Sequence, residues 1–320
     1  MTIRDNNHAK LMKSLLDKQQ LIADVIGNRK VSYIDVPLYR NVGDLLIMRG
    51  TLAFFERYRI KVRYKANWFN VAKNCIHRDD AVVFQGGGNM GDLYGGCQVV
   101  REKLIPELKD QRVIILPQTI FFEKYENYIK CCDKFRQHQD LHIFVRDQES
   151  YDLALQMTDY VYLMPDMAHQ LYPIAKPKFI NNRRSRLALM RVDKEMQSDR
   201  STPNADVITD WNLMFEKSNH IMVFVMRAMR VGALLGINRL PGSLGTEFGI
   251  LLTNYLVRRA IYLFSRFENV ITDRLHGHIL SCLLDIPNEV LDNSYGKNSH
   301  YVSLWTGESD LVTFDIKGRS

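Results

Sequence analysis

The chain has 320 residues, 46% of them hydrophobic and 25% charged, which is typical of a globular protein large enough for two domains. Its net charge of +7 suits an anionic small molecule or an anionic membrane face. The sequence has no run of basic residues interleaved with aromatic ones, so nucleic-acid binding is not favoured. Five cysteines without a CxxC pair argue against disulfides or structural zinc, and the polar N-terminus lacks a secretory signal, so we expect a cytoplasmic protein.

The first half of the chain has the pattern of an α/β fold. Residues 8–27 carry leucine and isoleucine at helical spacing and predict an amphipathic helix. From residue 31 to about 172, short apolar runs typical of strands alternate with helical patterns. This alternation predicts a parallel sheet with helices on both faces, whose ligand site lies at the carboxyl ends of the strands.

The first connection from strand to helix, at residues 37–44, is a polar turn that includes Asn41, Gly43 and Asp44. Gly43 would let the backbone approach a ligand closely, and the start of the next helix offers unpaired N–H groups to an anion. A plain turn between a strand and a helix explains these residues equally well.

A glycine-rich loop is predicted after the strand at residues 81–84. Six glycines lie within residues 86–96, and Asn89 and Asp92 lie among them. Consecutive glycines permit positive φ angles and a row of N–H groups that can hold a phosphate or a sugar. The spacing is neither a dinucleotide fingerprint nor a Walker loop. A flexible surface loop is the alternative, but a mere connector does not need the entropic cost of three adjacent glycines.

The next three predicted strands also end in polar groups. Gln118 follows the first of them, Arg146 the second, and Asp166 and His169 the third. Because the carboxyl ends of parallel strands meet at one edge of a sheet, Gln118, Asp166 and His169 are further candidates for ligand binding.

Residues 176–186 are polar and basic and predict a linker, which gives one domain at 1–175 and a second at 176–320. The second domain begins with a strand pattern at residues 187–190, and Arg191 follows it directly.

The densest charged cluster of the chain follows an apolar strand pattern at residues 270–272. It contains Asp273, Arg274, His276 and His278. The guanidinium of arginine suits carboxylate or phosphate, and histidine changes its charge near neutral pH. An ion pair between Arg274 and Asp273, with a histidine that caps the helix, is the alternative. Clustered titratable groups at the edge of a sheet favour an anion site with its own proton donor.

Residues 221–267 are strongly apolar but are interrupted by arginines, among them Arg227, Arg230, Arg258 and Arg259. They contain no unbroken run of the roughly 20 apolar residues that a transmembrane helix needs. Our first interpretation is core helices with arginines that reach the surface, and the second is a peripheral contact with anionic lipid.

Six short motifs, taken in order, resemble the polysaccharide pyruvyl transferase family. They are residues 41–44 (NVGD), 85–92 (QGGGNMGD), 116–119 (LPQT), 165–169 (PDMAH), 191–195 (RVDKE) and 272–277 (TDRLHG). The resemblance covers most of residues 31–305, although no motif falls within 221–267. It implies a GT-B-like α/β fold, in which two Rossmann-like domains with parallel sheets face a cleft. It also implies transfer of pyruvate from phosphoenolpyruvate onto sugar hydroxyls as a ketal, in exopolysaccharide or cell-wall glycan synthesis.

The resemblance also implies roles for individual residues. Arg191 and Arg274 would hold the carboxylate and phosphate of phosphoenolpyruvate, His276 would be the general acid, and Asp44 or Asp92 would accept the proton of a sugar hydroxyl. The expected catalytic residues are His276, Arg274, Asp44 and Asp92. The expected substrate-binding residues are Arg191, Arg274, Gly86, Gly87, Gly88, Asn89, Gln118, Asn41, Asp166 and His169. No metal and no cofactor are expected besides the donor substrate.

Two other functions remain open at this stage. One is a GT-B-type glycosyltransferase that uses a nucleotide sugar, and the other is a non-catalytic protein that binds glycans. For the pyruvyl transferase, galactose, glucose, mannose and N-acetylmannosamine all offer suitable hydroxyl pairs. A lipid-linked acceptor would place the protein at the inner face of the membrane.

Overall fold

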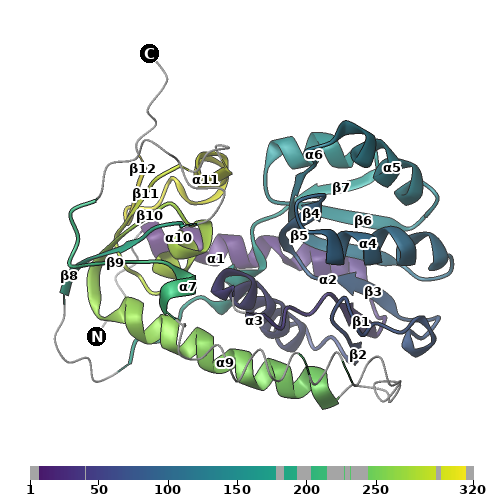
Figure 1. Cartoon of the computed structure of the whole chain (residues 1–320), viewed down its shortest axis with the longest axis horizontal. Coiled ribbons are helices and arrows are strands. Elements are labelled where there is room, and N and C mark those ends of the chain that lie inside the picture. Colours follow the sequence, from purple (N-terminus) through teal and green to yellow (C-terminus); the bar gives the residue numbers. More distant parts are fainter. Residues whose placement is uncertain are drawn as a thin grey trace.

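The computed structural model describes residues 7–39, 41–177, 184–192, 203–214, 227, 231, 244–292 and 297–314. In this part of the chain, two parallel β-sheets lie side by side, one from each half of the sequence, and helices cover them (Figure 1). The long helix α9 (Leu244–Ser265) runs along one side of the molecule, from the C-terminal half towards α3 (Val42–Arg57) (Figure 1).

The N-terminal sheet has the strand order β2-β1-β3-β5-β6-β7, with β4 paired to β5, and its pairings are parallel. Its strands are β1 (Val31–Ile34), β2 (Val62–Lys65), β3 (Ala81–Phe84), β4 (Gly87–Gly91), β5 (Val113–Phe121), β6 (Leu141–Val145) and β7 (Tyr160–Leu163). Strands β1, β3 and β6 are buried along their whole length, as in a parallel sheet with helices on both faces. The predicted β–α alternation is confirmed.

Two parts of this sheet differ from the prediction. Residues 87–91, expected within a loop, form strand β4, and β5 continues to residue 121 through Pro117. The proline has no N–H to donate, and the register between β5 and β6 shifts at this point. The extension of β5 gives β4 its partner, with Gly87 opposite Gln118.

Helices connect the strands of this half and cover its sheet. They are α1 (Asn7–Lys18), α2 (Gln20–Ile26), α3, α4 (Gly95–Leu104), α5 (Tyr125–Phe135) and α6 (Gln148–Ala154), with 3₁₀-helices η1 (Lys73–Cys75), η2 (Ile105–Glu107) and η3 (Met167–Leu171). The single helix predicted over 8–27 is interrupted at Gln19. Its buried side-chain amide donates to the backbone oxygens of Pro165 and Asp166, at 3.1 and 2.9 Å.

The C-terminal sheet has the strand order β12-β11-β10-β8-β9, and its pairings are also parallel. Its strands are β8 (Arg184–Leu189), β9 (Val207–Thr209), β10 (Phe267–Thr272), β11 (Asn288–Val290) and β12 (Val312–Phe314). The helices are α7 (Trp211–Met214), α9, α10 (Leu275–Leu283), α11 (Lys297–Tyr301) and the π-helix η6 (Val302–Thr306). The linker prediction at 176–186 was wrong for residues 184–186, which begin β8, and residues 178–183 lie outside the described part.

The two halves share one apolar interior. Buried side chains of α3, α9, α10 and strands of both sheets belong to a single hydrophobic cluster, in which α3 packs against η3, α9 and α10. Helix α1 joins the C-terminal half, because the His8 ring contacts Ser309 Oγ at 2.7 Å and Cys282 O at 2.9 Å. The predicted GT-B-like α/β fold, with two Rossmann-like halves of parallel strands, is confirmed. The division at residue 175 separates the strands of the two sheets and, as a domain boundary, stays a prediction.

Gly50 is the point of closest approach between α3 and η3. A Cβ atom at this position would lie 2.0 Å from the carbonyl oxygen of Met167. We expect Gly50→Ala to lower the free energy of unfolding by roughly 1–3 kcal/mol, because rigid backbone would have to move. Denaturant unfolding measures this loss.

Gly95→Ala is the matched control, because no atom lies within 4 Å of the position that a Cβ would take at Gly95. Equal stability of the two variants would contradict the close contact at Gly50.

Candidate functional site

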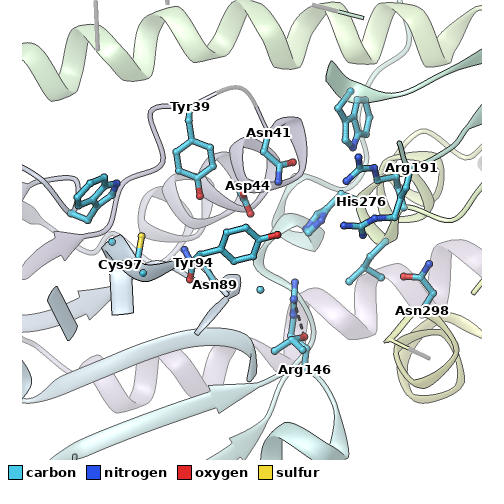
Figure 2. Close-up of a pocket in the computed structure, with 18 residues that line it drawn as sticks. Tyr39, Asn41, Asp44, Asn89, Tyr94, Cys97, Arg146, Arg191, His276 and Asn298 are labelled. Atoms are coloured by element: carbon cyan, nitrogen blue, oxygen red, sulfur yellow. Dashed lines mark hydrogen bonds between the residues drawn. The ribbon is translucent and has the colours of Figure 1, made fainter. Parts of the chain in front are cut away.

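A pocket of about 520 Å³ lies between the carboxyl ends of the strands of the two sheets (Figure 2). The predicted site residues that line it are Asn41, Asp44, Gly88, Asn89, Arg191, Arg274 and His276. They come from both halves of the chain, so the structure brings the two groups of motifs together. Lining residues without a predicted role include four aromatic side chains, Tyr39, Trp68, Tyr94 and Trp211, together with Arg146.

Three helices begin at the pocket. Asn41 caps α3 by accepting a hydrogen bond from Gly43 N at 3.0 Å. The first turn of α4 contributes Gly95 and Gly96, and the first turn of α10 contributes His276. Because the first turns of helices carry unpaired N–H groups and the positive end of the helix dipole, their convergence favours an anionic ligand.

Arg274 is held at the pocket by a carboxylate that the sequence analysis did not single out. Its Nε and Nη2 donate to the two carboxylate oxygens of the buried Asp210, at 2.9 and 2.6 Å. Its backbone N–H donates to Thr272 Oγ1 at 3.0 Å, which fixes the turn after β10. This bidentate geometry orients the guanidinium at the pocket wall, where the carboxylate offsets part of its charge.

Arg191 lies at the end of β8, where its backbone N–H donates to Asp273 Oδ1 at 2.8 Å. Its side chain lines the pocket beside His276 (Figure 2). The motif that begins at Arg191 continues through residues 193–195, which lie outside the described residues.

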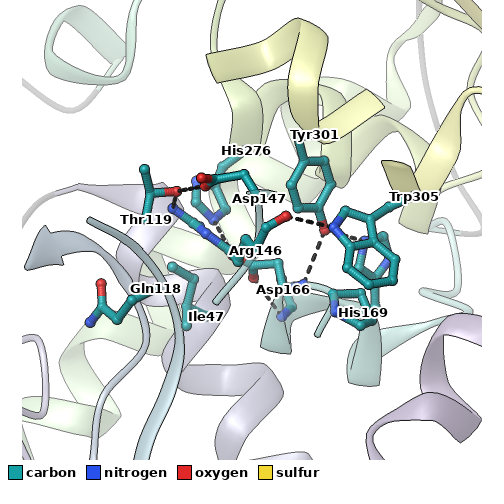
Figure 3. A network of polar contacts seen from close by, with 12 residues as sticks. Ile47, Gln118, Thr119, Arg146, Asp147, Asp166, His169, His276, Tyr301 and Trp305 are labelled. Atoms are coloured by element: carbon teal, nitrogen blue, oxygen red, sulfur yellow. Dashed lines mark hydrogen bonds and ion pairs between the residues drawn. The ribbon is translucent and has the colours of Figure 1, made fainter. Parts of the chain in front are cut away.

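Arg146, noted at a strand end but given no role, is the third arginine of the pocket. It is buried, and its Nη1 pairs with Asp166 Oδ2 at 2.5 Å, while its Nη2 donates to Thr119 Oγ1 at 2.9 Å (Figure 3). Burial alone would raise the pKa of Asp166, but His276 and Arg146 lower it below its usual range. Asp166 is therefore a stable carboxylate, which fixes Arg146 from behind the pocket.

His276 lies between two carboxyl groups from the N-terminal half. Its Nε2 is 3.4 Å from Asp166 Oδ2, and Asp44 lies near it in the pocket wall (Figures 2 and 3). The ring rests on the first turn of α3, because a Cβ at Gly43 would lie 2.8 Å from His276 Nδ1. The imidazole is thus placed to exchange protons with a ligand.

Asp44 is a carboxyl group with the properties of a general base. Burial raises its pKa above the usual value, and the nearby His276 and the hydroxyl of Tyr39, which hydrogen-bonds to it, act in the opposite direction. A carboxylate whose pKa is raised accepts a proton more readily than one with the usual pKa.

Asn89 is oriented by a buried polar network beneath the glycine-rich stretch. Its Oδ1 accepts from Arg101 Nη2 at 2.9 Å and from Gln118 Nε2 at 3.1 Å. Arg101 in turn forms an ion pair with Asp35 at 2.9 Å, and neither of these two side chains is exposed. Gln118, predicted to bind substrate, therefore lies behind the pocket and acts on it through Asn89.

Gly86 and Gly87 also lie behind the surface of the pocket, where backbone segments come close together. A Cβ at Gly86 would lie 2.7 Å from Pro117 O, and Gly87 has a φ of 133°. Only glycine adopts this conformation without strain. The two residues shape the turn that presents Gly88 and Asn89 to the pocket.

Three other predicted residues lie outside the pocket lining. Asp92 accepts hydrogen bonds from Glu123 N, Lys124 N and the Asn127 side chain, at 2.6, 3.0 and 3.0 Å, and so fixes the start of α5. Asp166 supports Arg146 and His276 from behind. Burial lowers the pKa of His169 to about 3, and this neutral ring contacts the Tyr301 hydroxyl at 2.9 Å.

The predicted cluster at residues 273–278 divides between the pocket and the core. His278 lies on the buried side of α10, where its ring contacts Asn288 Oδ1 at 2.7 Å and Thr306 Oγ1 at 2.8 Å. Residues two positions apart on a helix do not share a face, so His276 and His278 separate. Among the described residues, no group of three or more His, Cys, Asp and Glu side chains could hold a metal ion.

Comparisons with known proteins agree with the motifs. A family model described as polysaccharide pyruvyl transferase matches residues 41–295. The chain is 38% identical over 305 residues to EpsO of Bacillus subtilis (strain 168), whose name places it among the pyruvyl transferases, and the match covers 94% of this chain and 92% of that protein. It is 27% identical over 334 aligned positions to general stress protein 30 of the same strain, covering 99% and 90%.

A solved structure has the same fold. The crystal structure of an uncharacterised protein from Klebsiella pneumoniae matches with a TM-score of 0.59 and 21% identity, and the match covers 95% of this chain and 98% of that one. At this identity the likeness concerns the fold alone.

Replacing Asp44 tests its environment through stability. Because the pKa of Asp44 is raised in the folded state, its ionised form opposes folding, and this cost is absent below the pKa of a free aspartate, 3.8. Asp44→Asn should therefore raise the free energy of unfolding at pH 7.5, and the gain should shrink as the pH falls towards 4.

Asp92→Asn is the control with the opposite sign, because the pKa of Asp92 is lowered. Its hydrogen-bonded carboxylate stabilises the fold above the unfolded pKa and loses this effect in acid, so the substitution should destabilise the protein at pH 7.5. Urea unfolding at several pH values measures both changes. Destabilisation by Asp44→Asn at pH 7.5 would refute the proposed environment.

Proposed function

The chain belongs to the polysaccharide pyruvyl transferase family, and from this membership we propose that it transfers pyruvate from phosphoenolpyruvate onto two hydroxyls of a saccharide as a ketal. The observation that carries the proposal is the meeting of Arg146, Arg191 and Arg274 with His276 and Asp44 in one pocket. Each group matches a requirement of this reaction.

The arginines suit the donor substrate. Phosphoenolpyruvate has a carboxylate and a phosphate on the same carbon, and planar guanidinium groups bind both kinds of anion through paired hydrogen bonds. Arg191 and Arg274 lie at neighbouring strand ends of the C-terminal sheet, since β8 pairs with β10. The N-terminus of α10 supplies further positive potential there.

His276 and Asp44 suit the proton transfers. A proton from His276 adds to the methylene carbon of the donor, and positive charge develops on the carbon that carries the phosphate. A sugar hydroxyl attacks this carbon and gives its proton to Asp44. The C–O bond to phosphate then breaks, the second hydroxyl attacks, and its proton leaves with the phosphate. Of the two hydroxyl protons, one is held by Asp44 and the other leaves with the phosphate, while His276 has given one proton to carbon. Transfer of the proton from Asp44 to His276 regenerates both side chains.

Asp166 has a positioning role in this proposal. Its carboxylate holds Arg146 at 2.5 Å and lies 3.4 Å from His276 Nε2, so the proton donor and one cation keep a fixed relation. Fixed charges that need no reorganisation during the reaction are the main source of electrostatic catalysis.

Binding of phosphoenolpyruvate tests the donor site. We expect phosphoenolpyruvate to raise the melting temperature of the wild type, and Arg191→Ala to weaken its binding about 10–100-fold through loss of charge-assisted hydrogen bonds. His276→Ala should still bind the donor, but with a suitable acceptor its rate of phosphate release should be at least about 100-fold lower than that of the wild type. Calorimetry and a phosphate assay measure these two effects.

Arg78→Ala is the matched control, because the Arg78 side chain is 83% exposed and lies outside the pocket lining. A melting shift with UDP- or GDP-sugars but not with phosphoenolpyruvate would favour the nucleotide-sugar glycosyltransferase. Phosphate release that survives both substitutions would refute the roles proposed for Arg191 and His276. No phosphate release by the wild type with any acceptor would favour the non-catalytic glycan-binding protein.

We also propose that the outer face of α9 rests on an anionic membrane surface at the cytoplasmic side. Phe248, Leu251, Tyr255 and Tyr262 are 47–66% exposed and recur at helical spacing along this face. The exposed Arg258 and Arg259 lie along the same helix and can meet lipid phosphates. A lipid-linked acceptor would then reach the protein from the bilayer.

The predicted membrane surface also includes residues 221–243, most of which lie outside the described part. Only Arg227 and Val231 are described there, and both are exposed. None of the helices in the described ranges has the length and apolar character needed to cross a bilayer.

Flotation with vesicles that contain phosphatidylserine tests the α9 surface. We expect the wild type to float, and Arg258→Glu combined with Arg259→Glu to lower the partition coefficient about tenfold or more, because each arginine near an anionic surface contributes about 1 kcal/mol. Leu251→Ser should weaken binding as well. Leu155→Ser, at a residue 40% exposed outside α9, is the control. Failure of the wild type to float, or concentration-dependent dimerisation lost with Leu251→Ser, would contradict a membrane contact.

A further inference from the structure

The wall of the pocket formed by the N-terminal half differs in chemistry from the wall formed by the C-terminal half. Arg191, Arg274 and His276 belong to the C-terminal wall, together with Trp211, which is 3% exposed and stacks on Phe264. The N-terminal wall contains one of the arginines, Arg146, which is paired with Asp166. Three aromatic side chains, Tyr39, Trp68 and Tyr94, lie in the N-terminal wall, each from a different loop. An anionic donor and a neutral, partly apolar molecule could therefore occupy the two walls together.

The indole ring of Trp68 is held in place by α4. A Cβ at Gly96 would lie 3.1, 3.1 and 3.2 Å from Cδ2, Cε3 and Cε2 of Trp68. A point at nearly equal distance from three consecutive ring atoms, and this far away, lies over the face of the ring. One face of the indole thus packs on the first turn of α4, and any side chain at residue 96 would displace it.

The loop that carries Trp68 is itself fixed. Asn67 Oδ1 accepts from Phe69 N at 3.0 Å and from Asn70 N at 3.2 Å, and Asn70 Oδ1 accepts from Asn67 N at 2.9 Å. The Phe69 ring meets the Trp68 ring edge-on, with centroids 5.5 Å apart. Trp68 is only partly buried although its loop is rigid, as a preformed binding surface requires.

Tyr94 and Tyr39 extend this surface towards the reacting groups. Tyr94 is 53% exposed and projects across the pocket towards His276 (Figure 2). Tyr39 points into the pocket from the loop after β1, with its hydroxyl towards Asp44 (Figure 2). A molecule that lies on these rings would therefore present its edge to the proposed base.

We propose that Trp68, Tyr94 and Tyr39 form the acceptor subsite, which we call the aromatic platform, and that it binds the apolar C–H face of a neutral pyranose. This inference rests on the proposed pyruvyl transfer and assigns the saccharide to one wall. Aromatic faces carry negative potential and attract the weakly positive C–H groups of a sugar ring. The amides of Asn41 and Asn89, also at this wall, can bond to the hydroxyls.

The platform discriminates between classes of acceptor. The guanidinium of Arg146 at this wall is already paired with Asp166 and Thr119. A second phosphate here would therefore also meet the carboxyl group of Asp44, whereas a neutral sugar hydroxyl meets a proton acceptor. The geometry therefore favours an uncharged monosaccharide unit over a nucleoside diphosphate at this wall.

Two separate measurements test the platform. Saturation-transfer NMR with methyl glycosides of galactose, glucose and mannose, and with N-acetylmannosamine, detects sugar protons that lie against the protein. Thermal shift with phosphoenolpyruvate reports the donor site independently. We expect at least one sugar to give a signal with the wild type. Trp68→Ala and Tyr94→Ala should weaken that sugar about tenfold, while the shift by phosphoenolpyruvate stays unchanged.

Control variants separate the platform from folding. Tyr125→Ala removes an aromatic ring that is 72% exposed outside the pocket lining and should have no effect on sugar binding. Gly96→Ala keeps the indole but displaces it, and it should weaken the sugar like Trp68→Ala. Trp68→Phe should restore part of the binding. If Trp68→Ala does not fold, the Gly96→Ala and Tyr94→Ala pair carries the test.

The outcomes distinguish the platform from the proposed function. Equal sugar binding by all variants, or no signal from any of the four sugars, overturns the platform. The thermal shift with phosphoenolpyruvate tests the donor site separately. UMP serves as a probe for a nucleobase. If the wild type binds UMP but no sugar, and Trp68→Ala loses UMP binding, the rings hold a nucleobase and the inference is overturned. Sugar binding that depends on Trp68 in a protein without any response to phosphoenolpyruvate supports the platform and refutes pyruvyl transfer.

Discussion

One buried carboxylate joins the two halves of the pocket. Asp166 follows the last strand of the N-terminal sheet and faces Arg146 from the same sheet and His276 from α10 of the other half. Because both partners lower its pKa, the group stays charged although it is buried, and a buried charge is stable only while its partners remain in place. The spacing between the N-terminal wall and the C-terminal wall therefore depends on this contact.

The other buried ion pairs around the pocket have the same character. Asp210 holds Arg274, and Asp35 holds Arg101, which in turn orients Asn89. Buried ion pairs contribute little net stability, since desolvation offsets their attraction, but they fix geometry. Each pair here ends on a side chain of the pocket wall. The charges of the interior thus serve to preorganise the site more than to hold the fold together.

The sequence predicted the architecture well, because parallel strands covered on both faces leave apolar runs that end in polar groups, as β1, β3 and β6 do. It also indicated most residues of the anion-binding wall, since these follow strands directly. Asp210 also follows a strand, β9, but this three-residue strand was not predicted, and Arg101 lies within α4. The importance of both residues comes from partners 64 and 66 residues away in the chain. The aromatic platform was missed for a similar reason: a tryptophan on a loop does not reveal which face will be covered. Gln118 and His169 lie at the carboxyl edge of the sheet, as predicted, but their side chains pack away from the pocket.

The contacts of helix α1 with late parts of the chain affect folding during synthesis. The His8 ring contacts the backbone of Cys282, 274 residues later, and the Ser309 hydroxyl, while Gln19 next to α1 bonds to the turn at Asp166. A ribosome produces residue 8 long before residues 282 and 309. Until those later residues emerge, the contacts of His8 cannot form, so the end of α1 that carries it stays uncovered and molecular chaperones would meet it there.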